Sequence, residues 1–196
     1  MRRSLVLSEK YPLIRSATEL SEQLTTIANA KRPPVETWNP TVEVSVDIRI
    51  QRDGKWFYQG NPIERMALVK LFASVLKKEG RDYFLVTPVE KAKIEVEDAP
   101  FVITAMERYQ NDAGQPCIIL TTNLDESALV SEKHPIRVQI DPITEEPSPY
   151  VGMRSGMEAL IGRNVFYQLA DLAEERVIGG ESVYGVESVG VFFRLG

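Results

Sequence analysis

Residues 83–101 read YFLVTPVEKAKIEVEDAPF, and this stretch decides most of what the sequence predicts about the fold. Strand-forming residues dominate it, but Thr87, Glu90 and Lys91 interrupt them with polar groups. Pro88 cannot donate a hydrogen bond to a neighbouring strand, so the strand must kink, end or lie at an edge there. Polar groups at this density inside strand sequence need partners. The stretch therefore predicts either a strand crossover with solvated charges or the wall of a polar pocket.

Alternating apolar residues predict more strands on both sides of this stretch. Along residues 42–50 every second residue is Val or Ile, so one face would be buried and the other exposed. Asp53-Gly54 then predicts a tight turn into a second strand at Trp56-Phe57-Tyr58. Further strands are expected at 82–87, 92–97, 101–109, 116–122 and 136–140.

Three segments carry a capping residue three positions before a glutamate, which is the capping-box spacing of a helix start. They begin at Ser16, Asn61 and Ser155, and an apolar stripe at helical spacing follows each. The second helix is expected to stop at Gly80 and the third to run from Met157 to about residue 175. Three prolines between residues 141 and 149 predict an irregular connection after the strands.

These elements predict an α+β fold, with a duplicated core of antiparallel strands and packed helices. The duplication is suggested by two internal echoes, residues 54–60 in 190–196 and Glu90-Lys91 in Glu132-Lys133. The expected domains are an N-terminal helix and linker at 1–35, an N-terminal half at 36–110 and a C-terminal half at 111–196.

Composition narrows the function classes. The chain has 196 residues and a net charge of -5, so it lacks the basic field of a protein that binds nucleic acid or an anionic membrane. Cys117 is the single cysteine and His134 the single histidine, which excludes a disulfide within the chain and multi-histidine metal sites. The first ten residues hold too short an apolar run for a signal peptide, and no run is long enough to span a membrane. We therefore expect a cytoplasmic protein without nucleic-acid or membrane partners.

No known catalytic motif occurs in the sequence, so no catalytic residue is assigned and no cofactor is identified. Glu95, Glu97 and Asp98 could form a metal site, but solvent-facing strand positions explain them better, and no metal is assigned.

Three arginines fit anion binding better than plain surface charge. Arg154 directly precedes the expected helix start at Ser155, Arg163 follows in that helix, and Arg65 lies one turn into the middle helix. The free N–H groups of a helix start and a guanidinium group together bind anions well. Each arginine alone also has a structural explanation.

At these residues the sequence resembles a bacterial family known as domain of unknown function 1285. The resemblance covers about residues 38–196, and its most specific part is TPVEK followed by VEDAPF. A departure lies at Glu187, where the family pattern predicts an aromatic residue. Other matching segments are Trp38-Asn39-Pro40, Asp53-Gly54-Lys55-Trp56, Thr122-Asn123, His134-Pro135-Ile136-Arg137-Val138, Arg154, and Ala159-Leu160-Ile161 with Arg163.

The resemblance implies a duplicated α+β core whose C-terminal half is similar to pleckstrin-homology-type barrels. It also implies a cleft between the halves for a nucleotide-like ligand and a role in bacterial signal transduction, with no established activity. We expect the halves to meet along 83–101 and 122–138, with Phe101 buried and Glu90 and Lys91 exposed to the cleft.

The sequence thus predicts a protein that binds a small anionic or nucleotide-derived ligand. The alternatives are a protein-interaction module without a ligand, and an enzyme that uses Glu90 or Asp98 as a general base. The predicted ligand-binding residues are Arg65, Thr87, Glu90, Lys91, Asp98, Asn123, His134, Arg154 and Arg163.

Overall fold

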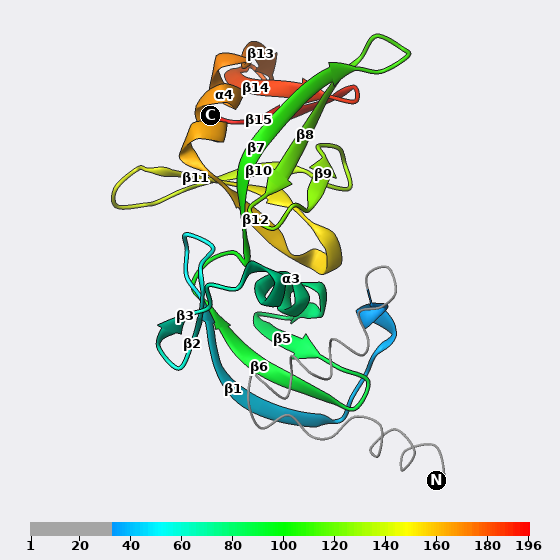
Figure 1. The fold of residues 1–196 in the computed structure, drawn as a ribbon. Coiled ribbons are helices and arrows are strands. Elements are labelled where there is room, and N and C mark those ends of the chain that lie inside the picture. Colours follow the sequence, from blue (N-terminus) through cyan, green and yellow to red (C-terminus); the bar gives the residue numbers. More distant parts are fainter. Residues whose placement is uncertain (1–32) are drawn as a thin grey trace. The chain divides into compact units, whose positions relative to one another are not determined.

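The structure is a computed structural model that describes residues 33–196, in two compact units divided between Asp98 and Ala99 (Figure 1). The sequence placed this division at 110/111. The division comes earlier because strands β7 (Phe101–Gln110) and β8 (Pro116–Thr122) pair as one hairpin within the second unit. Each unit is described by itself, so the expected cleft between the halves stays a prediction. The helix expected from Ser16 lies outside the described residues.

The N-terminal unit is built on a six-stranded sheet with the order β3-β2-β1-β6-β5-β4. All neighbouring strands run antiparallel except β1 and β6, which are parallel. The short 3-10 helix η1 (Val35–Thr37) precedes the sheet, and helix α3 (Met66–Ser74) joins β3 to β4. The strands are β1 (Val42–Ile50), β2 (Trp56–Tyr58), β3 (Asn61–Pro62), β4 (Leu76–Glu79), β5 (Asp82–Val86) and β6 (Glu90–Val96).

The core of this unit lies between α3 and the sheet. Phe72 of α3 is fully buried, and the ring centroid of Trp56 lies 6.2 Å from its ring. Trp56 is only 2% exposed, which agrees with the structural role that its hairpin position suggests. The alternation read along residues 42–50 is confirmed, since Ile48 and Ile50 are buried and Arg49 is exposed.

The C-terminal unit has a six-stranded sheet with the order β10-β11-β12-β7-β8-β9, and a three-stranded sheet β13-β14-β15. The pair β12 and β7 is parallel, and the other pairs are antiparallel. Helix α4 (Arg163–Asp171) joins the two sheets, and η2 (Arg154–Gly156) precedes β12. The remaining strands are β9 (Ser127–Leu129), β10 (Ile136–Ile140), β11 (Pro147–Gly152), β12 (Glu158–Ile161), β13 (Glu174–Ile178), β14 (Glu181–Ser188) and β15 (Val191–Arg194).

The predicted fold class, α+β with packed helices, is wrong, and the likeness of the C-terminal half to a pleckstrin-homology fold stays a prediction. The described residues are mostly β, with only two α-helices of nine residues each, so the units are curled sheets with one helix apiece. A duplication still fits, because each unit has a six-stranded sheet with one parallel pair.

Two of the three capping boxes lie in the described residues, and both fail for the same physical reason. Asn61 and Pro62 form β3, which pairs with β2, and Glu158 is the first residue of β12, which pairs with β11. Residues of both capping boxes therefore belong to strands and do not begin a helix. The helices start later, after Arg65 and Gly162, and neither start has a side-chain cap. The proline-rich connection also contains a strand, β11, which pairs with β10.

The predicted strands are confirmed within one or two residues. They were expected at 42–50, 56–58, 82–87, 92–97, 101–109, 116–122 and 136–140. Among residues 33–196, no helix is long and apolar enough to cross a membrane.

Candidate functional site

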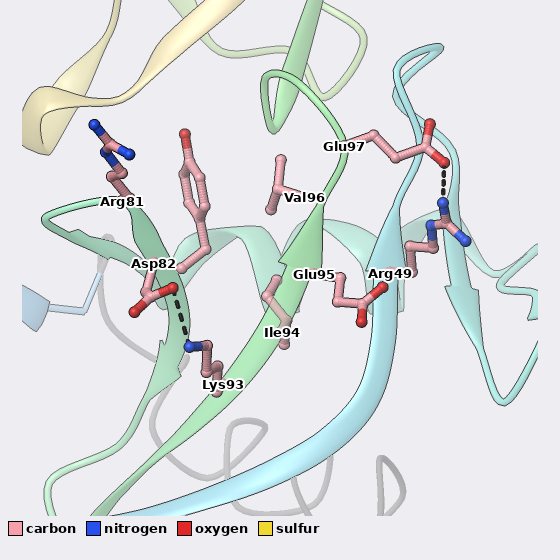
Figure 2. A pocket seen from close by; sticks show the side chains of 9 residues that line it. Arg49, Arg81, Asp82, Lys93, Ile94, Glu95, Val96 and Glu97 are labelled. Atoms are coloured by element: carbon pink, nitrogen blue, oxygen red, sulfur yellow. Dashed lines mark ion pairs between the residues drawn. The ribbon is translucent and has the colours of Figure 1, made fainter.

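A pocket of about 340 Å³ opens in the N-terminal unit, at the end of the sheet where β5 begins and β6 ends (Figure 2). Its walls hold Tyr83, Ile94 and Val96 together with three positively and three negatively charged side chains. The charged residues that line it are Arg49, Arg81, Asp82, Lys93, Glu95 and Glu97.

Strand register explains why these charges gather. Arg49 of β1 is opposite Glu95 of β6, and Lys93 of β6 is opposite Phe84 of β5. Because side chains alternate along a strand, Lys93 and Glu95 lie on one face, and Asp82 lies on it two residues before Phe84. The central strand β6 thus collects charged side chains from both neighbours.

Four of the six charges are already paired. Lys93 Nζ lies 3.0 Å from Asp82 Oδ1, and Arg49 Nη2 lies 2.6 Å from Glu97 Oε1. Figure 2 shows these two pairs on opposite sides of the pocket, with Ile94 between them on β6. Each pair links a neighbouring strand to β6 or to the residue after it, which leaves two charged residues of the lining outside these pairs.

Arg81 and Glu95 are those other two charges. Both are exposed, and neither forms an ion pair with any residue in the described range. Arg81 comes directly before β5, after Gly80, whose φ of +63° makes the turn from β4. The pocket therefore has one guanidinium group and one carboxylate that a ligand can reach.

The sequence did not single out Arg49, Arg81 or Lys93. Arg49 lies on the exposed face of β1 and Lys93 belongs to the polar stretch, but only the strand order brings them to one pocket. The β1–β6 pairing joins segments about 48 residues apart, which no local pattern reveals.

Thr87 and Glu90 instead close the turn between β5 and β6. The Thr87 hydroxyl donates to the Glu90 carbonyl oxygen at 3.0 Å and accepts the Glu90 N–H at 3.1 Å. Both residues are completely buried. The prediction that Glu90 is exposed is therefore wrong, because the turn folds it into the core.

Lys91 belongs to an ion-pair network on the sheet face. Its Nζ lies 2.5 Å from Glu79 and 3.6 Å from Glu43, and 4.3 Å from the centroid of the Phe84 ring. The hydrogen bond to Glu79 raises the pKa of Lys91, and the same bond lowers the pKa of Glu79. Two carboxylates thus already neutralise the cation that was predicted to bind an anion.

Asp98 and Arg65 also lie outside the pocket lining. Asp98 Oδ2 lies 3.3 Å from Arg52 Nε, next to Glu97, which accepts the Arg52 N–H at 2.9 Å. These contacts anchor the β1–β2 turn to the end of β6. Arg65 is exposed at the start of α3, where its carbonyl oxygen accepts the first helical hydrogen bonds.

In the C-terminal unit, Asn123, His134 and Arg154 lie at one end of the six-stranded sheet, where β8 and β11 end and β7 begins. Asn123 Oδ1 accepts the Val102 N–H at 3.1 Å, and His134 Nδ1 lies 2.9 Å from the Gly152 carbonyl oxygen.

Arg154 is the third of these. It lies 3.1 Å from Glu126, and its guanidinium carbon is 5.7 Å from the centroid of the buried Phe101 ring. These contacts explain Asn123, His134 and Arg154 structurally, and the role of the three residues in ligand binding stays a prediction.

Arg163 is exposed at the first position of α4 and lines a groove of about 290 Å³ with Val102, Ile103 and Val165. Strand β12 separates it from Arg154, and four residues of strand span roughly 13 Å. The prediction that Arg154 precedes the helix in which Arg163 lies is therefore wrong, because a strand follows Arg154 and the helix begins only at Arg163. Within residues 33–196, no group of three or more Asp, Glu, His or Cys side chains could hold a metal ion.

Comparison with known proteins gives the same two-part organisation. A family model described as the N-terminal domain of domain of unknown function DUF1285 matches residues 33–99, and the model of the DUF1285 C-terminal domain matches residues 100–195. No curated protein matches the chain.

Two solved structures are similar to it. A DUF1285 family protein from Silicibacter pomeroyi DSS-3 has 43% sequence identity and a TM-score of 0.83, covering 93% of this chain and 96% of that chain. A second, from Shewanella baltica OS155, has 29% identity and a TM-score of 0.51, over 63% of this chain and 90% of that one. Together the two family models span nearly all of the described residues, so the chain belongs to the DUF1285 family.

Proposed function

We propose that the protein binds a small anionic ligand, of which a nucleotide-derived molecule is one kind, in the pocket of its N-terminal unit. The observation that carries this proposal is Arg81, an exposed guanidinium group on the pocket wall without an ion pair among the described residues. A guanidinium group in this state is a strong donor to carboxylate or phosphate oxygens.

The volume and the charges of the pocket limit the ligand. About 340 Å³ is at the lower end of the range for small-molecule sites. Asp82, Glu95 and Glu97 line the same space, and their repulsion disfavours ligands with many negative charges. The best fit is a compact ligand whose single anionic group binds Arg81.

Ligand binding is better supported than the two alternatives. A general base must reach its substrate, but Glu90 is fully buried and Asp98 is paired with Arg52. An interaction module needs no concave site lined with charges of both signs. We propose a role in cytoplasmic signalling, in which ligand binding reports the presence of the anion.

Thermal melting with a defined set of anions tests the proposal. The set is acetate, citrate, inorganic phosphate, AMP and ATP, each at millimolar concentration. A ligand at a hundredfold excess over its Kd adds about 2.7 kcal/mol to stability. For a chain of this size the melting temperature should rise by ~2–4 °C per kcal/mol.

The variant Arg81→Gln should lose the shift and keep the unliganded melting temperature, because Arg81 is exposed. Arg65→Gln is the matched control, since Arg65 is also exposed but lies outside the pocket lining. A melting temperature that no anion changes, or a shift that survives Arg81→Gln, would contradict the proposed site.

A further inference from the structure

The hairpin of β10 and β11 presents an unusual apolar side chain at its tip. Ile143 is 90% exposed, the highest value among the large hydrophobic residues of the described range. The loop that carries it extends beyond the sheet of the C-terminal unit (Figure 1). A single exposed isoleucine needs no explanation by itself. The turn that carries Ile143, however, is fixed by hydrogen bonds.

Asp141 fixes the turn. One of its carboxylate oxygens accepts the N–H groups of both Ile143 and Thr144 at 2.8 Å. Its own N–H donates to the Glu146 carbonyl oxygen, and its carbonyl oxygen accepts the Glu145 N–H, each at 3.0 Å. The two bonds to the carboxylate also keep the pKa of Asp141 below its usual value. Ile143 is thus presented on an ordered turn, which lowers the entropy cost of binding.

The tip is also acidic. Residues 140–149 contain Asp141, Glu145 and Glu146 but no lysine or arginine. A partner for this tip therefore needs an apolar recess for one branched side chain and a positive charge at its rim. The negative charge makes an anionic lipid surface a poor partner.

The C-terminal unit has a surface with these properties. The groove of about 290 Å³ between β7 and the start of α4 is lined by Val102, Thr104, Gly162 and Asn164, and also by Ile103 and Val165, which are almost completely buried. Arg163 stands at its rim, exposed and without an ion pair among the described residues. The recess is larger than an isoleucine side chain, and the rim charge is opposite to that of the tip.

We propose that two copies of this chain associate through this contact, with Ile143 of one copy inserted into the groove beside Arg163 of the other. Arg163 then faces the acidic residues that flank Ile143. A two-fold pair makes the contact twice, because each copy offers both a tip and a groove. The contact area is small, so the association is weak and is measured at concentrations up to ~1 mM.

Sedimentation velocity over a concentration series is the direct test. The protein should show reversible, salt-sensitive association, since the contact combines apolar burial with exposed charges. Ile143→Ser should weaken the pair by at least ~100-fold, because the pair loses two buried aliphatic side chains and each loss costs roughly tenfold or more. Val177→Ser is the matched control, because Val177 is 76% exposed but lies on β13.

Mixing two variants separates this contact from other forms of self-association. Ile143→Ser removes the apolar side chain of the tip and leaves the groove intact. Arg163→Glu reverses the charge at the groove and leaves the tip intact. Neither variant should associate alone, but an equimolar mixture should form mixed complexes, because one tip and one groove remain compatible. Both positions are exposed, so both variants should fold, which circular dichroism checks.

Three results would overturn the proposal. The first is a protein that stays monomeric over the whole concentration range. The second is association that survives Ile143→Ser or Arg163→Glu. The third is a mixture of the two variants that associates no more than either one alone.

Discussion

Val189 adopts a backbone conformation that β-branched residues rarely take. Its φ is +52°, and Gly190 follows with φ +74°, in a two-residue turn between the paired residues Ser188 and Val191. Positive φ at both positions is the type I′ geometry, for which Asn-Gly is strongly preferred. The Val189 N–H donates to the Pro116 carbonyl oxygen at 2.8 Å, so the turn is tied to the start of β8.

We predict that Val189→Asn stabilises the protein by about 1 kcal/mol, because asparagine tolerates this conformation and valine does not. The bond to Pro116 comes from the backbone and is retained. Urea unfolding measures the change. Gly190→Ala is the converse control and should destabilise, since it adds a Cβ at φ +74° and 3.0 Å from Gln115 Nε2. A Val189→Asn variant that is less stable than the parent would contradict the inference that the backbone of Val189 is strained.

Glu187 shows how one residue can be understood only with its neighbours. The family pattern predicts an aromatic residue there, but Glu187 lies 2.5 Å from Arg176. The guanidinium carbon of Arg176 lies 4.4 Å from the centroid of the Phe192 ring, and Glu187 raises the pKa of Arg176. The departure is thus matched by an ion pair that covers the neighbouring aromatic ring.

At the scale of elements, strand β4 shows how the N-terminal sheet protects its edge. Lys77 and Glu79 project from β4, and Lys91 of β6 binds Glu79 across β5. Charged side chains on an edge strand discourage pairing with other chains. The same network fixes one part of the pH dependence of stability.

Glu79 has a folded-state pKa below its usual value, chiefly because of its hydrogen bond to Lys91. The stabilisation that ionised Glu79 contributes is therefore fully present above the pKa that Glu79 has in the unfolded chain. It is lost as the pH falls through the lower pKa of Glu79 in the folded state. We predict that Glu79→Gln flattens the decline in unfolding free energy between about pH 5 and about pH 3. Because Glu79 is 36% exposed, the difference should stay below about 1 kcal/mol.

Denaturant unfolding at several pH values measures this difference. Glu64→Gln, at an exposed position outside the network, is the control and should follow the parent curve. Parallel curves for Glu79→Gln and the parent would show that the ion pair does not act on stability.

Strands with plain alternation were predictable from the sequence, whereas helix starts, and the strands β4 and β12 that lie inside the expected helices, were not. Alternation along residues 42–50 depends only on one face being buried, and the observed β1 has these bounds. The capping spacing at Ser155–Glu158 is equally clear, but pairing of β12 with β7 outweighs a local preference worth about 1 kcal/mol. A local pattern cannot anticipate a strand partner more than 50 residues away.

The same limit applies to the candidate site. The polar stretch 83–101 does contribute to the pocket, through Lys93, Glu95 and Glu97. Of its residues that were predicted to bind the ligand, Thr87 and Glu90 close a turn and Lys91 is neutralised. The sequence shows which residues are charged. Whether a charged side chain is already paired depends on its neighbours in the folded structure.

At the scale of the whole molecule, each unit has a core of its own. Phe72, Ile50 and Leu85 are fully buried in the first, and Phe101 and Leu120 in the second. The N-terminal family model ends at this division and the C-terminal model begins there, within one residue. A boundary with separate cores on either side is typical of domains that fold independently.

We predict that residues 33–98 and 99–196, expressed separately, each fold and melt cooperatively. Circular dichroism and amide NMR spectra would show native-like sheet in both fragments, because each sheet is completed within its own unit. A fragment that lacks dispersed amide signals would show that its unit needs the rest of the chain.

The parallel pairs have a consequence for the order in which the chain acquires structure. Phe101 of β7 pairs with Ala159 of β12, 58 residues later, whereas its hairpin partner β8 follows within about 20 residues. Contacts so distant in sequence form slowly, since a long loop must close before they gain any energy. During synthesis at ~5–20 residues per second, the β7–β8 hairpin waits several seconds with one edge unpaired. Folding of the C-terminal unit should therefore be limited by the arrival of β12, and that open edge is the point at which a chaperone or a misfolded partner could intervene.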